Sequence, residues 1–131
     1  MRIKQLLIGM IASVIAVSSY VEMAIADLKF PMLVYRTGAY APNGLPNADG
    51  FVDYYKMINA RDGGIGGEKI FHPECETGYK TQVGVECYEK NKKDAMVFQP
   101  MSTGITYQLI PKATADGLSL IHISEPTRHR L

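Results

Sequence analysis

The chain has 131 residues, enough for one small domain at most. Its 14 basic and 13 acidic residues nearly balance, at a formal net charge of +1. Within residues 27–117 the one basic cluster, Lys90, Lys92 and Lys93, adjoins Asp94 and is most simply a solvated helix end. Because nucleic-acid binding rests on a concentrated basic patch, the composition gives it no support.

Residues 1–26 have the features of a secretory signal peptide. Arg2 and Lys4 precede an apolar run, and Ala24-Ile25-Ala26 supplies small residues at positions −3 and −1 of a cleavage site. The alternative is a membrane anchor, but Glu22 interrupts the stretch before it reaches the roughly 20 apolar residues that spanning requires. We expect cleavage after Ala26 and a periplasmic location.

The next segment predicts a strand, a loop and a helix. Met32–Tyr35 is continuously apolar and predicts a short buried strand. Residues 36–50 are rich in Gly, Pro and Asn and predict a loop. From Phe51 apolar residues recur on one helical face, and Asp62-Gly63-Gly64 predicts the end of that helix.

The same order then repeats. Residues 70–74 predict a second strand with an irregular end at Pro73, and Thr77-Gly78 opens a second helix. Residues 95–98 predict a third strand and 99–103 a loop. A third helix is expected over 104–115, although Pro111 would interrupt or kink it.

Strands alternating with helices predict an α/β fold, a three-layer αβα arrangement with a parallel sheet. In such sheets ligands bind beyond the carboxyl ends of the strands. The loops 36–50 and 99–104 would therefore lie at the binding edge.

Cys75 and Cys87 form an even pair in a chain expected to enter an oxidising compartment, so a disulfide is possible. Two separate buried thiols are the alternative, because geometry decides the pairing. The C-x11-C spacing without a further His or Cys nearby is poor for zinc. We expect no metal and no cofactor.

The glycine-rich run 63–67 is superficially similar to a nucleotide-binding loop. A phosphate-binding loop follows a strand and precedes a helix, whereas this run follows a helix and precedes a strand. We interpret it as a compact turn. His72 has no second histidine nearby to build a catalytic set with, since His122 and His129 lie in the C-terminal tail, so we expect no enzyme.

Ser102-Thr103-Gly104 lies between the third strand and the third helix. Two hydroxyls beside the N–H groups of a helix start could receive a small carboxylate. The alternative is a helix N-cap formed by Thr103. One residue could serve both purposes.

Three segments carry a family resemblance: Thr37 to Gly44, Asn59 to Ile70, and Val97 to Gly104. Together they resemble the periplasmic substrate-binding proteins of ABC importers, most closely the branched-chain amino-acid (leucine-binding protein) group. The resemblance covers residues 31–117, the first part of the N-terminal lobe. It implies a type I periplasmic-binding fold of two lobes, whose closed form is selected by ligand.

The resemblance also implies ligand-binding residues. A hydroxyl residue after the third strand, Thr103 or Ser102, would hold the ligand carboxylate, with Met101 and Gly104 beside it. The wall residue after the first strand falls near Asn43, where an aromatic is common, and Tyr40 is the candidate to replace that aromatic. This departure, and Gln99 where the family usually has glycine, leave the ligand undetermined.

Residues 118–128 resemble the translation of a transposase adapter used in sequencing libraries. We therefore expect 118–131 to be an artefactual tail, with 27–117 an incomplete N-terminal lobe that is inactive alone. The intact protein would be a monomer that captures a branched-chain-type amino acid and presents it to an ABC permease. The alternatives are the extracytoplasmic ligand-sensing domain of a receptor and a secreted flavodoxin-like enzyme missing its catalytic half.

Overall fold

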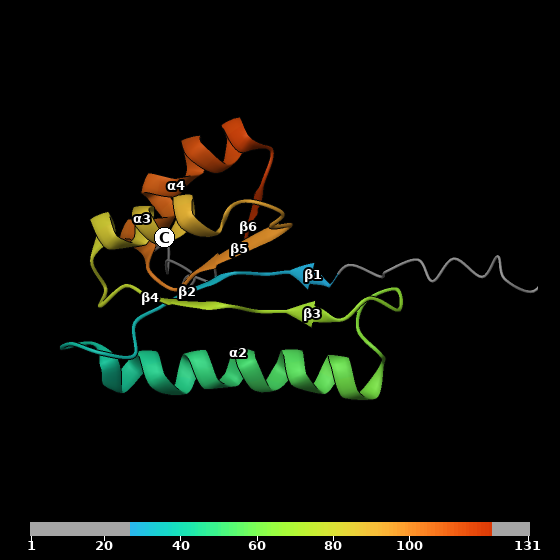
Figure 1. Cartoon of the computed structure of the whole chain (residues 1–131). Helices are drawn as coiled ribbons and strands as arrows, with labels where there is room; N and C mark the ends of the chain where they lie inside the picture. Colours follow the sequence, from blue (N-terminus) through green and yellow to red (C-terminus); the bar gives the residue numbers. More distant parts are fainter. Residues whose placement is uncertain (1–26, 122–131) are drawn as a thin grey trace, which may run out of the picture.

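A computed structural model describes residues 27–121 (Figure 1). The expected signal peptide, most of the expected tail and both of the tail's histidines lie outside these residues. None of the helices in the described part has the length and hydropathy needed to span a membrane. The elements are β1 (Leu28–Lys29), β2 (Met32–Val34), α2 (Ala41–Arg61), β3 (Ile70–Phe71), β4 (Glu74–Glu76), α3 (Thr81–Asn91), β5 (Val97–Pro100), α4 (Thr103–Asp116) and β6 (Ser119–Leu120).

The elements form three layers, as predicted: α2 covers one face of a parallel sheet, and α3 and α4 cover the other (Figure 1). The main sheet has the order β4-β2-β5-β6. Alternate residues of β2 serve the two faces. Leu33 packs with α3 and α4, whereas Met32 and Val34 pack with α2. All three are at most 1% exposed, so β2 is the centre of both cores.

Two facing prolines divide the ladder beside β2. β1 pairs with β3, and β2 with β4, in one continuous register that places Pro31 opposite Pro73. The ladder continues across the break, because the Met32 N–H donates to the Pro73 carbonyl at 2.9 Å. Proline has no N–H to donate, which explains why the expected strand 70–74 is instead two short strands.

The prediction of a loop over residues 36–50 is wrong for its second half, because α2 begins at Ala41. Pro42 lies in the first turn, where a missing N–H leaves no helical bond unmade. Gly44 is buried against Tyr35, so here glycine permits close packing. The composition typical of loops therefore belongs to a helix start.

Three other boundaries differ from the sequence prediction. Helix α3 starts at Thr81, after a turn over 77–80. Strand β5 extends to Pro100, and the buried Gln99 is accommodated because the Tyr55 hydroxyl donates to its Oε1 at 2.8 Å. Helix α4 continues through Pro111, which has no N–H to donate to the carbonyl four residues earlier. Pro111 is exposed, so that water can bond this carbonyl instead.

The glycine run between α2 and β3 is a turn, as predicted. Ile65 and Glu68 exchange two backbone hydrogen bonds, at 2.8 and 3.1 Å, around Gly66 and Gly67, both of which have positive φ. Asn59 then fixes the end of α2 to the sheet. Its side chain both accepts from the Ile70 N–H and donates to the Ile70 carbonyl, each at 2.8 Å.

Cys75 and Cys87 are joined by a disulfide between β4 and α3, with 5.9 Å between their Cα atoms. Strand β6 pairs with β5 in parallel, although Ser119 and Leu120 fall within the adapter-like run. Leu118 and Leu120 pack against the core on the α3–α4 side.

Glycine 44 is expected to be essential to the packing of α2. In Gly44→Ala the new Cβ would collide with the carbonyl oxygen and ring of Tyr35, so the free energy of unfolding should fall by about 1–3 kcal/mol. Gly50→Ala is the matched control in the same helix, since its Cβ would meet nothing within 4 Å. That variant should gain about 0.5–1 kcal/mol. Urea unfolding followed by circular dichroism measures both, and equal effects would contradict the packing.

The disulfide is expected to contribute about 2–3 kcal/mol, because the loop it closes is short. Urea unfolding of the oxidised chain should therefore have a higher midpoint than unfolding in a reducing agent. The double variant Cys75→Ala, Cys87→Ala is the control, and its midpoint should not respond to the reductant. A thiol assay that finds two reactive cysteines in the untreated native chain would contradict the bond.

Candidate functional site

Three chain segments meet at the carboxyl edge of the sheet: residues 35–40 after β2, 77–80 after β4 and 101–104 after β5. The Thr77 N–H donates to the Val34 carbonyl at 2.8 Å, and the Met101 N–H donates to the Leu33 carbonyl at 3.1 Å. A Cβ built on Gly104 would lie 3.4 Å from the Thr81 hydroxyl oxygen, so the starts of α3 and α4 are adjacent. This edge is where an open parallel sheet binds ligands.

Ser102 and Thr103 have different positions at the start of α4. Ser102 is 4% exposed and is the N-cap, its hydroxyl accepting from the Ile105 N–H at 3.5 Å. Its carbonyl accepts from the Thr106 N–H at 2.9 Å and from the Thr106 hydroxyl at 2.8 Å. Thr103 and Gly104 are exposed. The cap predicted for Thr103 thus falls on Ser102, which leaves Thr103 and Gly104 at the surface.

The remaining expected site residues lie in different environments. Tyr40 is the residue before α2 and is 55% exposed. Asn43 is exposed but lies in the first turn of α2, not in a loop. Met101 is 8% exposed and packs in the core on the α2 side. Of these three residues, Tyr40 has the most prominent position at the carboxyl edge.

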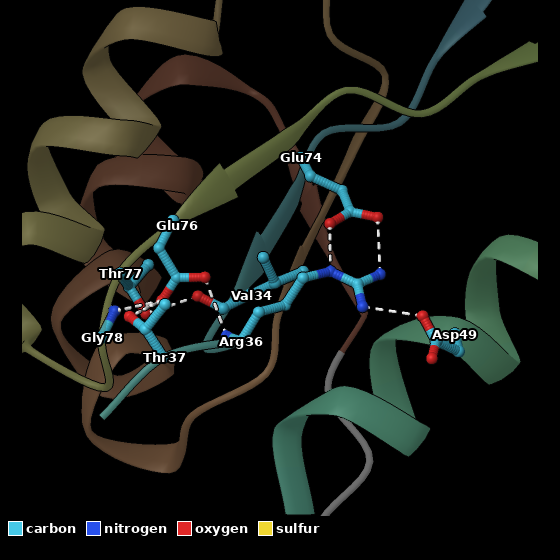
Figure 2. A network of polar contacts seen from close by, with 8 residues as sticks. All are labelled: Val34, Arg36, Thr37, Asp49, Glu74, Glu76, Thr77 and Gly78. Atoms are coloured by element: carbon cyan, nitrogen blue, oxygen red, sulfur yellow. Dashed lines mark hydrogen bonds and ion pairs between the residues drawn. The ribbon is translucent and has the colours of Figure 1, made fainter. Parts of the chain in front are cut away.

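Arg36, directly after β2, ties α2 to β4 (Figure 2). Its guanidinium donates twice to Glu74, from Nε to Oε2 at 2.6 Å and from Nη2 to Oε1 at 2.9 Å. Its Nη1 donates to Asp49 Oδ1 of α2 at 2.7 Å. Hydrogen bonds to these two carboxylates raise the pKa of Arg36 further above its ordinary value, so the tie persists at any physiological pH.

Glu76 joins the loop after β2 to the turn after β4 (Figure 2). Its Oε2 accepts from the Arg36 N–H at 2.8 Å, and its Oε1 accepts from the Thr37 hydroxyl at 3.1 Å and the Gly78 N–H at 2.8 Å. Desolvation by the surrounding protein disfavours the charged form, but these donors outweigh it and lower the pKa of Glu76 below its ordinary value. One carboxylate therefore orders two of the three segments.

A cluster of three tyrosines lies at the same edge. Tyr35 is buried, and the ring of Tyr79 contacts it edge-on with 4.8 Å between centroids. The Tyr40 ring lies against Tyr79 at 4.5 Å and an interplanar angle of 36°. Tyr79 has a left-handed backbone with φ of 63°. We call Tyr35, Tyr40 and Tyr79 the tyrosine cluster.

Sequence reasoning did not identify Arg36, Glu74, Glu76 or Tyr79. One signal was present in Glu74-Cys75-Glu76, where alternation along a strand places both carboxylates on one face and the cysteine on the other. The Cys75 bond to α3 fixes that orientation. An arginine at the end of the neighbouring buried strand would then be within reach of both carboxylates. Nothing in the sequence indicated the left-handed conformation of Tyr79.

Other candidate chemistry finds little support in the described residues. No group of three or more His, Cys, Asp and Glu side chains between Asp27 and Ile121 is placed to hold a metal ion. His72 lies beside the Tyr55 ring, 5.5 Å between centroids, away from the carboxyl edge. Its Nδ1 is buried and without a hydrogen-bond partner.

Glu76 is expected to make stability depend on pH. Because its pKa is lowered in the folded state, it stabilises the fold above the unfolded pKa of about 4.3, and this contribution is lost as the pH falls through the lower folded value. Urea unfolding from pH 7 to 3 should show a smaller acid loss in Glu76→Gln than in the wild type. Glu86→Gln removes a carboxylate from the exposed face of α3 and is the control. Equal acid losses in the wild type and Glu76→Gln would contradict the role of Glu76.

Comparison with solved structures places the fold. A protein described as an ABC transporter permease from the Pseudomonas fluorescens group has a TM-score of 0.68 and 37% identity, over 76% of this chain and 26% of that chain. A fatty acid ABC transporter substrate-binding protein from Thermomonospora curvata has a TM-score of 0.69 and 22% identity, over 75% of this chain and 25% of that chain. The branched-chain amino acid transporter substrate-binding protein LivJ from Streptococcus pneumoniae, in complex with isoleucine, has a TM-score of 0.66 and 22% identity. The match covers 74% of this chain and 28% of that chain.

This chain thus spans about a quarter of the length of those proteins. Comparison with curated proteins gave no match. The sequence model of the family described as periplasmic binding protein matches residues 27–129, which include every element of the sheet and its three helices. The chain belongs to the periplasmic binding protein family.

Proposed function

We propose that this chain forms part of an extracytoplasmic receptor that captures a small solute for an ABC importer. The observation that carries this proposal is the exposure of Thr103 and Gly104 at the start of α4, on the carboxyl edge of the sheet. The start of a helix attracts anions, because its backbone N–H groups and dipole present positive charge. A ligand carboxylate is the group that suits this position.

The local geometry supports a different task for each residue of Ser102-Thr103-Gly104. Ser102 is buried and its hydroxyl caps α4, so its task is structural. Thr103 is an exposed residue with a hydroxyl group. Gly104 has no side chain, which lets an anion approach the backbone closely. We therefore assign the carboxylate contact to Thr103 and Gly104.

The ligands named for similar structures favour a carboxylate with an apolar body. One structure holds isoleucine, another is a fatty acid receptor, and a third, a solute-binding protein from R. palustris, holds benzoate. Isoleucine, fatty acids and benzoate each combine a carboxylate with an apolar group, and isoleucine also has an α-ammonium group. A branched-chain amino acid is the ligand that we propose first for this chain.

The proposed receptor binds its ligand without transforming it, as a periplasmic monomer that delivers the solute to a membrane permease. A second lobe would complete the cleft, and closure would add the contacts that this lobe lacks. We expect the chain by itself to bind the ligand with a Kd in the millimolar range, which is too weak for calorimetry to measure. Nuclear magnetic resonance detects binding at that strength.

The proposal is tested by titrating the ¹⁵N-labelled chain with isoleucine and with benzoate. Amide shifts should concentrate at residues 102–105, at the start of α4. Thr103→Val keeps the side-chain shape and removes the hydroxyl, so affinity should fall about 5–10-fold, the equivalent of one hydrogen bond. Thr114→Val, near the other end of the same helix, is the matched control and should bind as the wild type does.

Two outcomes would contradict the assignment. One is the absence of any shift at residues 102–105 with either compound in the tens of millimolar. The other is equal binding by Thr103→Val and Thr114→Val, which would remove Thr103 from the site.

A further inference from the structure

The exposed part of the tyrosine cluster, Tyr40 and Tyr79, lies on the segments that follow β2 and β4 at the carboxyl edge of the sheet. Tyr40 and Tyr79 are 55% and 37% exposed, although their rings are in contact with each other. Two large aromatic side chains that are partly exposed on adjoining loops form an apolar surface in contact with water, and burying such a surface against a ligand is favourable. Buried Tyr35 supports them from behind through its contact with Tyr79.

The turn that carries Tyr79 is firmly held. The Thr77 hydroxyl donates to the Val34 carbonyl at 2.8 Å and accepts from the Tyr79 N–H at 3.2 Å. The Lys80 N–H donates to the Thr77 carbonyl at 3.0 Å, and the Gly78 N–H is bound by Glu76. A rigid support of this kind lets an aromatic ring contact a ligand with little loss of conformational entropy.

The backbone of Tyr79 gives a second indication. Its φ of 63° is a left-handed conformation that glycine or asparagine adopts more readily than tyrosine. The turn alone would therefore be better served by a smaller residue. Residues held in such conformations concentrate at functional sites, where the position of the side chain serves the function despite the backbone strain.

The tyrosine cluster is also close to the start of α4. Thr81, two residues after Tyr79, has its hydroxyl 3.4 Å from a Cβ built on Gly104. A Cβ built on Gly38, two residues before Tyr40, would lie 3.7 Å from the Gly78 carbonyl oxygen. The turn that carries Tyr79 thus leads into a helix start that adjoins the proposed carboxylate contact, and the loop that carries Tyr40 adjoins that turn.

We propose that Tyr79 is a ligand-specificity residue, which with Tyr40 forms an aromatic wall for the apolar body of a carboxylate held at Thr103 and Gly104. The inference rests on the proposed function and narrows it to carboxylates with a branched or planar apolar group. Small polar carboxylates would gain nothing from the wall.

The test compares acetate, which has no apolar body, with 4-methylpentanoate and benzoate. The full chain carries the ¹⁵N label and, in addition, ¹³C-labelled tyrosine rings. All three compounds should shift the amide signals of Thr103 and Gly104, but only the two larger compounds should shift the ring signals of Tyr40 and Tyr79. In Tyr79→Asn, which suits the left-handed backbone, both larger compounds should lose at least about fivefold in affinity. Acetate binding should be unchanged.

Two control variants separate the ring from the fold. Tyr79→Phe keeps the ring and should retain the preference for the larger compounds, and Tyr54→Ala removes an exposed tyrosine of α2 and should have no effect. An unchanged preference over acetate in Tyr79→Asn would overturn this inference and leave the proposed function standing. The absence of shifts at Thr103 and Gly104 with all three compounds would overturn both.

Discussion

The burial of β2 on both faces and along both edges is the constraint on which the rest of the structure depends. Parallel neighbours pair with it on either side, and the two core clusters meet at its alternating side chains. Because every strand in this sheet is parallel to it, all carboxyl ends reach the same edge. Segments that are far apart in the sequence can therefore contribute to one surface.

Polar contacts then determine the shape of that edge. The middle of the loop after β2, Thr37 to Ala39, has small side chains with little apolar surface, so packing alone would not fix it. Arg36 anchors its start to β4 and α2, and Glu76 binds its next residues together with the turn after β4. Each surface ion pair contributes little by itself, but a connected set with a bidentate arginine is more effective. The main effect is on geometry, because the tyrosine cluster depends on the same loops.

The fold class, the alternation of strands and helices, and the segment after β5 could be predicted from sequence because they depend on local pattern. A short, continuous hydrophobic run such as Met32–Val34 is typical of a strand that is buried on both faces of a parallel sheet. The start of α2 could not be predicted in this way. Pro42, Gly44 and Gly50 indicate a loop by composition, whereas α2 begins at Ala41 and packs Gly44 against Tyr35, a contact that no local pattern reveals. The same limit applies to Gln99, whose burial depends on a hydroxyl 44 residues away in α2.

The candidate site was partly predictable for a related reason. Thr103 and Gly104 follow from the rule that ligands bind at the carboxyl ends of parallel strands, which needs only the element order. Tyr79 does not follow from any local rule, because its importance depends on a positive φ and on rings contributed by two other segments. A helix start can attract any carboxylate, so it gives affinity for a class of compounds. Selection within that class requires a second surface, and among the described residues the tyrosine cluster offers an apolar one at the same edge of the sheet. The proposed role of Tyr79 in selectivity would give its positive φ and the hydrogen bonds of its turn a common explanation.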